Sequence, residues 1–287
     1  MHKTWSTPVC SEEKRLVPCK LCGSLSFRPS LLCENFSYVR CTGCGLVQMN
    51  PQPTEASIIH RYGEGSGEDY LLYQLQNEKT FLDLQLLALD DVDFNGLEKE
   101  LFSTVKEPGV LDIGCAIGSL LAFLGARGWK TMGIEISGPQ AEFGRTKRNL
   151  DIRTIALEEN HFPEGGFNVV ITSHLIEHLN DPAALAAEVH RILVPGGHFF
   201  VTSPNIDGFQ ARLFKSRWRS AIFDHLYLFS VKTLSRLLEE KGFAVEKIVT
   251  WGGLAAGTAP LPVKRIFDRA AKRFGFGDVM IIRARKV

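Results

Sequence analysis

Four cysteines near the N-terminus have the type and the spacing of ligands for one metal ion. They form two Cys-x-x-Cys pairs separated by eighteen residues: Cys19, Cys22, Cys41 and Cys44. This spacing is typical of a zinc site, and four thiolates complete the tetrahedral shell of a structural Zn²⁺. The segment is too short for a core of its own, so the metal would supply its folding free energy. The alternative is a set of free buried thiols; a catalytic zinc is disfavoured because four cysteines leave no open position.

A glycine-rich turn and a later acid indicate a nucleoside site. Residues 110–118 read Val-Leu-Asp-Ile-Gly-Cys-Ala-Ile-Gly. Glycine in such a turn lets a ligand approach the backbone closely. Glu135 lies 21 residues after Gly114, where a ribose-binding acid belongs, and its two oxygens can accept both ribose hydroxyls. Gly118 falls one place early for the dinucleotide fingerprint, so the pattern favours a different adenosine-type cofactor.

Alternating strands and helices must position these residues. We expect strands at Gly109–Ile113, Lys130–Ile136, Ile152–Ile155, Phe167–Thr172, Gly197–Ser203, Ala244–Thr250 and Asp278–Arg283. We expect helices at Ser119–Arg127, Ser137–Asn149, Pro182–Leu193 and Val231–Lys241. Ser137 and Gln140 have the spacing of a capping box. This alternation predicts a mostly parallel sheet with helices on both faces, in which ligands bind beyond the carboxyl ends of the strands.

The chain length of 287 residues gives a prior of about two domains. We expect an N-terminal zinc-binding module at 1–53, a linker and helical lid region at 54–105, and the main domain at 106–287. Within the middle region, the polar stretch 62–69 reads as a flexible linker or a lid, and residues 70–89 have apolar residues at helical spacing. Three tyrosines of this region are candidates either for pocket walls or for helix packing: Tyr62, Tyr70 and Tyr73.

Composition and charge exclude several classes of protein. Hydrophobic residues make up 45% and charged residues 23%, which excludes a wholly disordered or fibrous chain. The net charge of +1 gives no overall attraction to nucleic acid or to an anionic membrane. No apolar run reaches the roughly 18 residues of a transmembrane helix, and the first residues lack a signal-peptide core. We therefore expect a cytoplasmic protein, and the odd number of seven cysteines fits a reducing compartment.

The motifs together resemble the class I S-adenosylmethionine-dependent methyltransferases. The pattern Asp-x-Gly-x-Ala-x-Gly at 112–118 resembles motif I of that family, with Ala116 in place of the usual middle glycine. Residues 167–182 resemble the fourth-strand motif with its Glu-His continuation, although Asn168 replaces the usual Asp. Residues 193–205 resemble the Leu-x-Pro-Gly-Gly signature of the next strand. The four cysteines followed by Pro-x-Pro resemble a subgroup with an N-terminal zinc-binding module.

This resemblance implies a fold and a cofactor. The fold would be α/β, a Rossmann-like, doubly wound and mostly parallel seven-stranded sheet, preceded by the small zinc-binding module. Asp112 and the backbone around Gly114 would hold the methionine part of S-adenosylmethionine, and Glu135 would hold its ribose. The implied cofactor-binding residues are Asp112, Gly114, Cys115, Ala116, Gly118, Glu135, Ile136, Leu157, Glu158 and Ser173.

Methyl transfer mainly requires that acceptor and methyl group are positioned, and an alcohol acceptor also needs a base. Histidine is the natural base near neutral pH. By the resemblance, His174 and His178 follow the fourth strand, and His225 lies in the stretch where the family builds its acceptor pocket. These three are the candidate catalytic residues, although His178 has the alternative of only orienting its loop. His198 is expected to be structural.

We therefore expect methyl transfer to a small-molecule acceptor, with a hydroxyl oxygen of a sugar or another biosynthetic intermediate favoured. C-methylating members with a zinc-binding start usually carry an extra C-terminal domain, whereas this chain ends at Val287. One alternative is an RNA methyltransferase that grips its substrate with the zinc module, which has few cations for that purpose. Another is a non-catalytic, zinc-dependent interaction protein with a degenerate methyltransferase fold. The basic segments 209–223 and 264–274 are either binding surfaces or helices that pack on their own domain.

Overall fold

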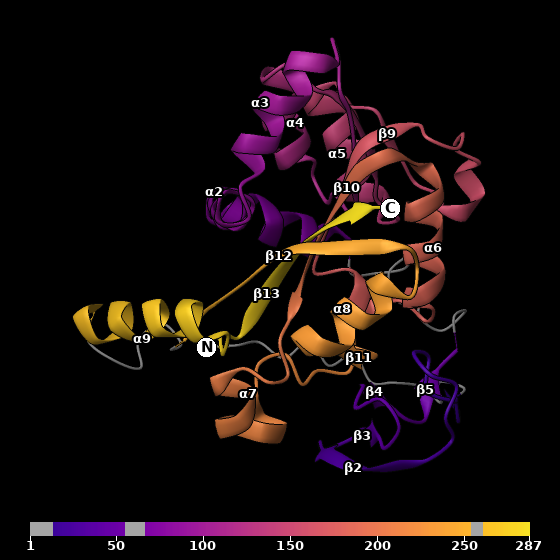
Figure 1. Cartoon of the computed structure of the whole chain (residues 1–287), viewed down its shortest axis with the longest axis vertical. Helices are drawn as coiled ribbons and strands as arrows, with labels where there is room; N and C mark the ends of the chain where they lie inside the picture. The colour runs from indigo at the N-terminus through magenta and orange to yellow at the C-terminus, as the bar shows by residue number, and fades with distance from the viewer. Residues whose placement is uncertain (1–13, 55–66, 254–260) are drawn as a thin grey trace.

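The computed structural model describes residues 14–54, 67–253 and 261–287 (Figure 1). Its centre is a seven-stranded sheet in the order β12-β13-β10-β9-β6-β7-β8. The strands are β6 (Gly109–Ile113), β7 (Lys130–Ile134), β8 (Ile152–Arg153), β9 (Phe167–Ser173), β10 (Leu193–Pro204), β12 (Phe243–Trp251) and β13 (Val279–Lys286). Neighbours from β8 to β10 pair parallel, whereas β13 runs antiparallel to both β10 and β12. The prediction of a Rossmann-like, mostly parallel α/β sheet of seven strands is confirmed.

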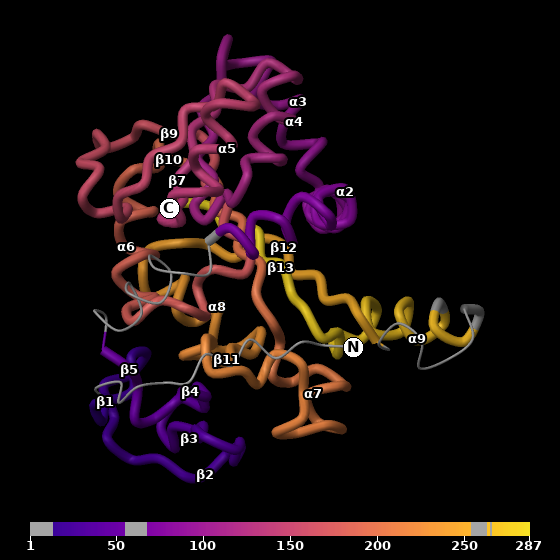
Figure 2. The backbone as a smooth tube through the Cα atoms, turned by 180° about the vertical axis from the view of Figure 1, so that it is seen from behind, coloured from indigo at the N-terminus to yellow at the C-terminus, as the bar shows by residue number. Residues whose placement is uncertain are grey.

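Helices cover both faces of this sheet (Figures 1 and 2). The helices of the described ranges are α2 (Gly67–Asp91), α3 (Phe94–Thr104), α4 (Ser119–Ala126), α5 (Gly138–Arg148), α6 (Pro182–Ile192), α7 (Phe209–Phe214), α8 (Val231–Glu239) and α9 (Leu261–Phe274). Of these, α7 and α9 lie away from the faces of the sheet (Figure 1). Three short 3-10 helices are η1 (Glu158–Asn160), η2 (Ile176–His178) and η3 (Lys215–Arg217).

Alternating side chains of the central strands supply two separate apolar cores. In β10, Phe200 packs with residues of α2, α3 and α4, whereas its neighbours Phe199 and Val201 pack with residues of α6 and α8. Adjacent residues of a strand point to opposite faces, so a continuous apolar run indicates a strand that is buried on both sides. The two adjacent apolar residues of β6 also point to opposite faces: Val110 packs in the core that contains Phe200, and Leu111 packs in the core that contains Phe199.

The N-terminal segment forms a second sheet that borrows a strand from the main domain. Its order is β11-β4-β3-β2, from β2 (Phe27–Leu32), β3 (Ser37–Cys41), β4 (Val47–Met49) and β11 (Tyr227–Leu228). A further pair joins β1 (Lys14–Arg15) to β5 (Gln52–Pro53). Leu46, Val47 and Met49 are fully buried in the same core as Trp218 and Phe229. Packing on the main domain therefore stabilises this segment in addition to any metal.

Several local expectations differ from the structure. The strand β7 ends at Ile134, so Glu135 and Ile136 lie in the loop after it, and β8 ends at Arg153. The predicted capping box is wrong, because the Ser137 hydroxyl contacts the Gln140 side chain instead of a backbone N–H of the helix. Part of the expected linker is helical, because α2 already begins at Gly67. The rest of that stretch, with Tyr62, lies outside the described residues.

No helix in the described ranges combines the length and the apolar character that crossing a membrane requires.

Candidate functional site

The turn between β6 and α4 bends through three left-handed residues. Gly114, Ala116 and Gly118 have φ angles of 77°, 48° and 76°. A Cβ atom on Gly118 would meet Cδ1 of Leu150, whose side chain would have to shift, and the left-handed φ itself favours glycine there. Ala116 adopts the left-handed conformation without that freedom, which costs about 1 kcal/mol. The turn thus exposes a bent backbone at the carboxyl end of β6, where open α/β sheets bind ligands.

Glu135 ties this turn to the loop after the neighbouring strand. Its Oε2 accepts a hydrogen bond from the Ala116 N–H at 2.9 Å, and its Oε1 accepts one from the Ser137 N–H at 2.8 Å. Burial raises the pKa of Glu135, although both hydrogen bonds act to lower it. Each carboxylate oxygen keeps a second lone pair. Glu135 can therefore shape the turn and still accept the hydroxyls of a ribose.

Asp112 is a buried carboxyl without a partner. Its side chain is 1% exposed, and neither oxygen has a hydrogen-bond partner in the described part of the chain. Burial, followed by the charge of Glu135, raises its pKa to about 7. An unpaired buried carboxyl costs free energy until a donor or a cation meets it. The ammonium group of a methionine would supply both, so this residue fits S-adenosylmethionine.

The remaining predicted cofactor residues lie at or beyond the carboxyl ends of the parallel strands, but their side chains differ in exposure. Cys115 is 7% exposed and its side chain packs with Leu121 and Ile152, so only its backbone can face a ligand. Ile136 is 47% exposed directly beside Glu135. The other three follow parallel strands at the same end: Ser173 closes β9, and Leu157 and Glu158 follow β8. The Leu157 side chain is buried in the core.

Tyr70, in the first turn of α2, also lies close enough to sense the charge of Glu135. Burial raises the pKa of the Tyr70 hydroxyl, a hydrogen bond from Gln74 lowers it, and the charge of Glu135 raises it further. Its ring stacks on Tyr73 with centroids 6.3 Å apart. The two alternatives for these tyrosines, pocket wall and helix packing, therefore both retain support.

The three candidate catalytic histidines meet around Glu177. This carboxylate is fully buried; its Oε1 lies 3.3 Å from Nδ1 of His174, and its Oε2 accepts a hydrogen bond from Oγ of Ser203 at 3.0 Å. The ring of His178 stands nearly perpendicular to that of His225, with centroids 4.6 Å apart. A backbone hydrogen bond from the Leu226 N–H to the Glu177 carbonyl holds the two loops together.

Electrostatics in this cluster favour a charged carboxylate and a neutral imidazole. Burial alone would raise the pKa of Glu177, but the hydrogen bond from His174 and the neighbouring histidines bring it to about 2. Burial, followed by the charge of His178, lowers the pKa of His225 to about 4. Nδ1 of His225 lies 2.8 Å from the Ser220 carbonyl, which places the ring proton on Nδ1. Sequence reasoning did not include Glu177 among the site residues, although the Glu-His dipeptide after β9 signals it.

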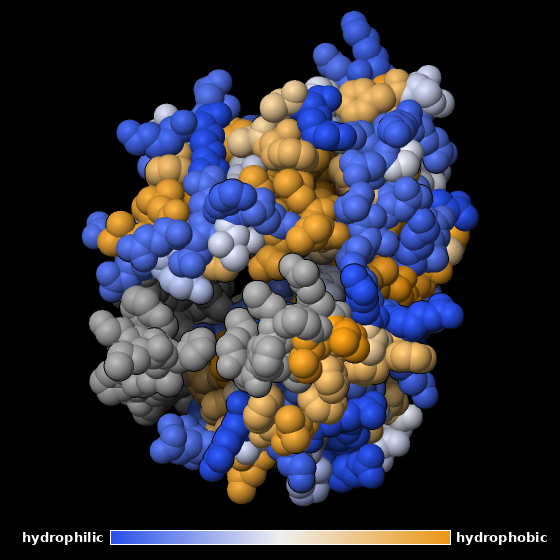
Figure 3. Space-filling model, turned by 90° about the vertical axis from the view of Figure 1, so that its left-hand side faces the viewer, coloured by the Kyte–Doolittle hydropathy of each residue, from blue (hydrophilic) through white to orange (hydrophobic). Residues whose placement is uncertain are grey.

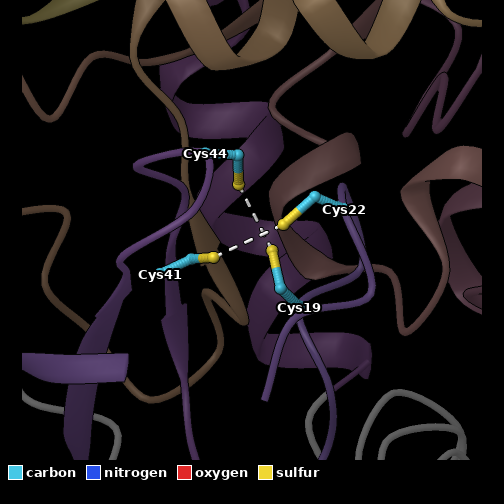
Figure 4. A group of neighbouring side chains, drawn as sticks. All are labelled: Cys19, Cys22, Cys41 and Cys44. Atoms are coloured by element: carbon cyan, nitrogen blue, oxygen red, sulfur yellow. Dashed lines mark hydrogen bonds between the residues drawn. The ribbon is translucent and has the colours of Figure 1, made fainter. Parts of the chain in front are cut away.

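The four predicted metal ligands gather at one point (Figure 4). Sγ of Cys19 lies 3.4 Å from Sγ of Cys44, Sγ of Cys22 lies 3.5 Å from Sγ of Cys41, and the four sulfurs lie within 4.8 Å of one another. Tetrahedral zinc with Zn–S bonds of about 2.3 Å would require S···S distances of about 3.8 Å. The sulfurs of these two pairs would thus have to move apart slightly to accommodate Zn²⁺. Cys33 lies elsewhere, with Sγ 3.9 Å from the Ser216 carbonyl.

The module that carries these cysteines also supports the loop of His225. The hydroxyl of Tyr38 in β3 lies 2.7 Å from the Ile222 carbonyl and 2.8 Å from the His225 carbonyl. The Met49 N–H donates to the Leu226 carbonyl at 2.8 Å, next to the pairing of β4 with β11. The position of His225 therefore depends on the N-terminal sheet.

The two basic segments have different environments. In the segment 209–223, Trp218 is buried and its Nε1 donates a hydrogen bond to Asp278. The same carboxylate accepts a second hydrogen bond from Nε of Arg219 at 2.6 Å. The segment 264–274 belongs to α9, which projects from the body of the molecule (Figure 1) and exposes Ile266 and Phe274. On the face that Figure 3 shows, hydrophobic residues lie in patches between hydrophilic ones. Trp218 packs inward, as the alternative of a helix that packs on its own domain predicts, whereas Phe214 of the same segment is exposed.

The sheet order, with a single strand antiparallel to its neighbours, and the glycine turn define the class I methyltransferase fold. A solved structure from Thermotoga maritima, described as an S-adenosylmethionine-dependent methyltransferase and possible histamine N-methyltransferase, shares it with a TM-score of 0.54. That similarity covers 78% of this chain and all of the other at 20% identity.

The methyltransferase domain family matches residues 84–248, more than half of the chain. The protein therefore belongs to this family, whose cofactor is S-adenosylmethionine.

Two curated relatives are similar over shorter stretches. A ubiquinone biosynthesis O-methyltransferase of Acinetobacter baumannii is 31% identical over 103 residues, which cover 33% of this chain and 44% of the relative. A probable S-adenosylmethionine-dependent methyltransferase of Mycolicibacterium smegmatis is 31% identical over 140 residues, 48% of this chain and 52% of the relative. The chain thus spans about half the length of the curated relatives it matches.

Proposed function

We propose that this protein transfers a methyl group from S-adenosylmethionine to a small-molecule acceptor, and that the accepting atom is a hydroxyl oxygen of a sugar or another biosynthetic intermediate. The observation that carries the proposal is the pair of acids at the glycine turn. Asp112 is a buried carboxyl that meets no hydrogen-bond partner among the residues the structure describes, and the Glu135 carboxylate has lone pairs to spare. The oxygen acceptor is supported by the name of the Acinetobacter baumannii relative, an O-methyltransferase.

Each residue of the turn has a distinct task in this proposal. Asp112 binds the ammonium group of the methionine, and its burial keeps competing water away. Glu135 accepts the ribose hydroxyls while it holds the backbone of Ala116 in place. The exposed side chain of Ile136 flanks the adenine, together with Glu158 and the backbone of Leu157, whose side chain is buried in the core. When bound, S-adenosylmethionine supplies an electrophilic methyl group. The protein then has to hold the acceptor in line with that group and to remove the acceptor's proton.

The histidine cluster is where we place the acceptor. His174, His178 and His225 are the candidate catalytic residues, because all three lie against Glu177 just beyond β9. Leu175, between His174 and Glu177 in sequence, would touch a Cβ on Gly114 at 3.3 Å. A side chain of the loop that carries the cluster therefore packs against the cofactor turn, which supports a transfer between the two sites.

We also propose that the four cysteines bind one structural Zn²⁺. The tight cluster of sulfurs supports this, together with the turns made by Gly23 and Gly45, whose φ angles are 71° and 85°. In our proposal the zinc holds a module of residues 1–53, a lid region follows at 54–105, and the methyltransferase domain occupies 106–287. The metal acts on the reaction indirectly, through the contacts of Tyr38 and Met49 with the loop of His225.

Calorimetry with S-adenosylmethionine tests the cofactor assignment. We expect binding by the native chain, and at least about tenfold weaker binding by Glu135→Ala, because hydrogen bonds to a charged group contribute about 1.5–3 kcal/mol. The exposed acid Asp151 provides the control, and Asp151→Asn should bind as the native chain does. An unchanged affinity in Glu135→Ala would refute the ribose assignment. Incubation with methyl-labelled cofactor and a panel of hydroxylated, amine and carbon acceptors would then identify the accepting atom.

A further inference from the structure

A second group of metal-ligating side chains lies apart from the four cysteines. Glu177, His178 and His225 each offer a ligand atom, and these atoms lie within 4.8 Å of one another. The two histidines come from loops that are far apart in sequence, after β9 and before β11. A carboxylate with two imidazoles is a donor set that suits divalent first-row metals and leaves several coordination positions open.

The ring of His225 is held in the tautomer that a metal ligand needs. Its Nδ1 lies 2.8 Å from the Ser220 carbonyl, so the proton on Nδ1 is donated there and the lone pair remains on Nε2. The residue is 7% exposed, and its Nε2 is the ring nitrogen left to bind a metal. Metal-bound histidines characteristically donate their other ring N–H to a carbonyl or carboxylate. His225 thus has the supporting contact of a ligand before any metal is bound.

The carboxylate of Glu177 is oriented in a similar way. Ser203 donates from Oγ to Oε2 at 3.0 Å, and His174 contributes a ring nitrogen 3.3 Å from Oε1. Both contacts fix the carboxylate, and each oxygen keeps a further lone pair. Because this carboxylate is fully buried beside two imidazoles, water does not solvate its charge, and a bound cation would compensate it.

We infer that Glu177, His178 and His225 form a binding site for one divalent first-row transition-metal ion, with open positions for an oxygen of the methyl acceptor. The imidazole and carboxylate donors distinguish this site from the thiolate site, because hard Mn²⁺ prefers oxygen and nitrogen ligands to thiolates. The binding of the metal does not depend on the proposed methyl transfer; only its use by the acceptor rests on that function. A hydroxyl bound to the metal would lose its proton more easily, so the two histidines would act as ligands rather than as bases.

Binding of Mn²⁺ alone tests the site, in the full chain loaded with one equivalent of zinc for its cysteine site and without S-adenosylmethionine, because excess Zn²⁺ would compete for the imidazole and carboxylate donors. Electron paramagnetic resonance counts free Mn²⁺, and we expect one ion bound per chain. Glu177→Gln and His225→Ala should each weaken binding more than tenfold, because each removes one ligand. The control is His161→Gln, since His161 is exposed and lies outside the cluster. Circular dichroism establishes that each variant is folded.

A second readout needs no variant. Bound Mn²⁺ is paramagnetic, so it should broaden the ring proton signals of His178 and His225 in the native protein well before that of His161. The inference is overturned if no Mn²⁺ binds at about 1 mM, a concentration that would reveal even weak sites. It is equally overturned if Glu177→Gln and His225→Ala bind as tightly as the control. Because S-adenosylmethionine binding is measured separately by calorimetry, a failed metal site leaves the proposed function standing, and the reverse also holds.

Discussion

Replacing Asp112 by asparagine should stabilise the protein without cofactor and at the same time weaken cofactor binding. The carboxyl is 1% exposed, and both of its oxygens lack partners in the described ranges. Burial raises its pKa from an ordinary value of 3.8 to about 7. Each pKa unit corresponds to about 1.4 kcal/mol, so ionising this group in the folded state costs about 4 kcal/mol.

The sign of the effect follows from proton linkage. Below about pH 4 the carboxyl is protonated in both the folded and the unfolded chain, and it does not affect the free energy of unfolding. Between about pH 4 and 7 the unfolded chain loses the proton while the folded chain keeps it, so stability falls. Above about pH 7 the loss levels off at about 4 kcal/mol. Asparagine carries no such proton, so Asp112→Asn avoids the loss.

Urea denaturation of both proteins at a series of pH values measures this. The difference in free energy of unfolding, variant minus native, should rise by up to about 4 kcal/mol between pH 4 and pH 8. Asp151→Asn, at an exposed position, is the matched control and should show no such rise. Calorimetry should meanwhile show at least about tenfold weaker binding of S-adenosylmethionine by Asp112→Asn. A difference that is flat with pH would mean that the carboxyl is paired or solvated, and would remove the reason to place an ammonium beside it.

Three further results are expected. Ala116→Gly should raise the free energy of unfolding by about 1 kcal/mol, because glycine relieves the left-handed φ of 48°; a loss of stability in urea denaturation would contradict this. Asp278→Ala should lower the free energy of unfolding by about 1–3 kcal/mol, because the buried N–H of Trp218 loses the carboxylate that accepts its hydrogen bond, whereas Arg219 is largely exposed; an unchanged denaturation midpoint would show that these contacts contribute little. Removal of the proposed zinc by a chelator should speed amide exchange at 222–228, because Tyr38 holds that loop; equal exchange before and after chelation would show that the module does not hold the loop of His225.

The predictions that succeeded depend on short stretches of sequence. The strand β6 has the predicted bounds, Gly109–Ile113, because an apolar run closed by a glycine turn is a strong local signal. The four cysteines were expected at one point because two Cys-x-x-Cys pairs at that spacing each form one turn. Predictions of hydrogen bonding were weaker. The backbone N–H of Ser137 bonds to the side chain of Glu135, and its hydroxyl meets a side chain rather than the backbone that a capping box requires.

By itself, the sequence determined which residues carry chemistry and which of them lie at strand ends, because the periodicity of burial and the turn-forming glycines act between near neighbours in the chain. Only the tertiary structure decided which strand ends meet. It brought His225 against His178 and Glu177, and it gave the N-terminal sheet its last strand, β11, from the main domain. It also buried Asp112 where nothing in the described part of the chain donates a hydrogen bond to it. These features depend on how loops that are distant in sequence pack against one core. Many weak contacts together decide that packing, so it cannot be predicted from the pattern of neighbouring residues.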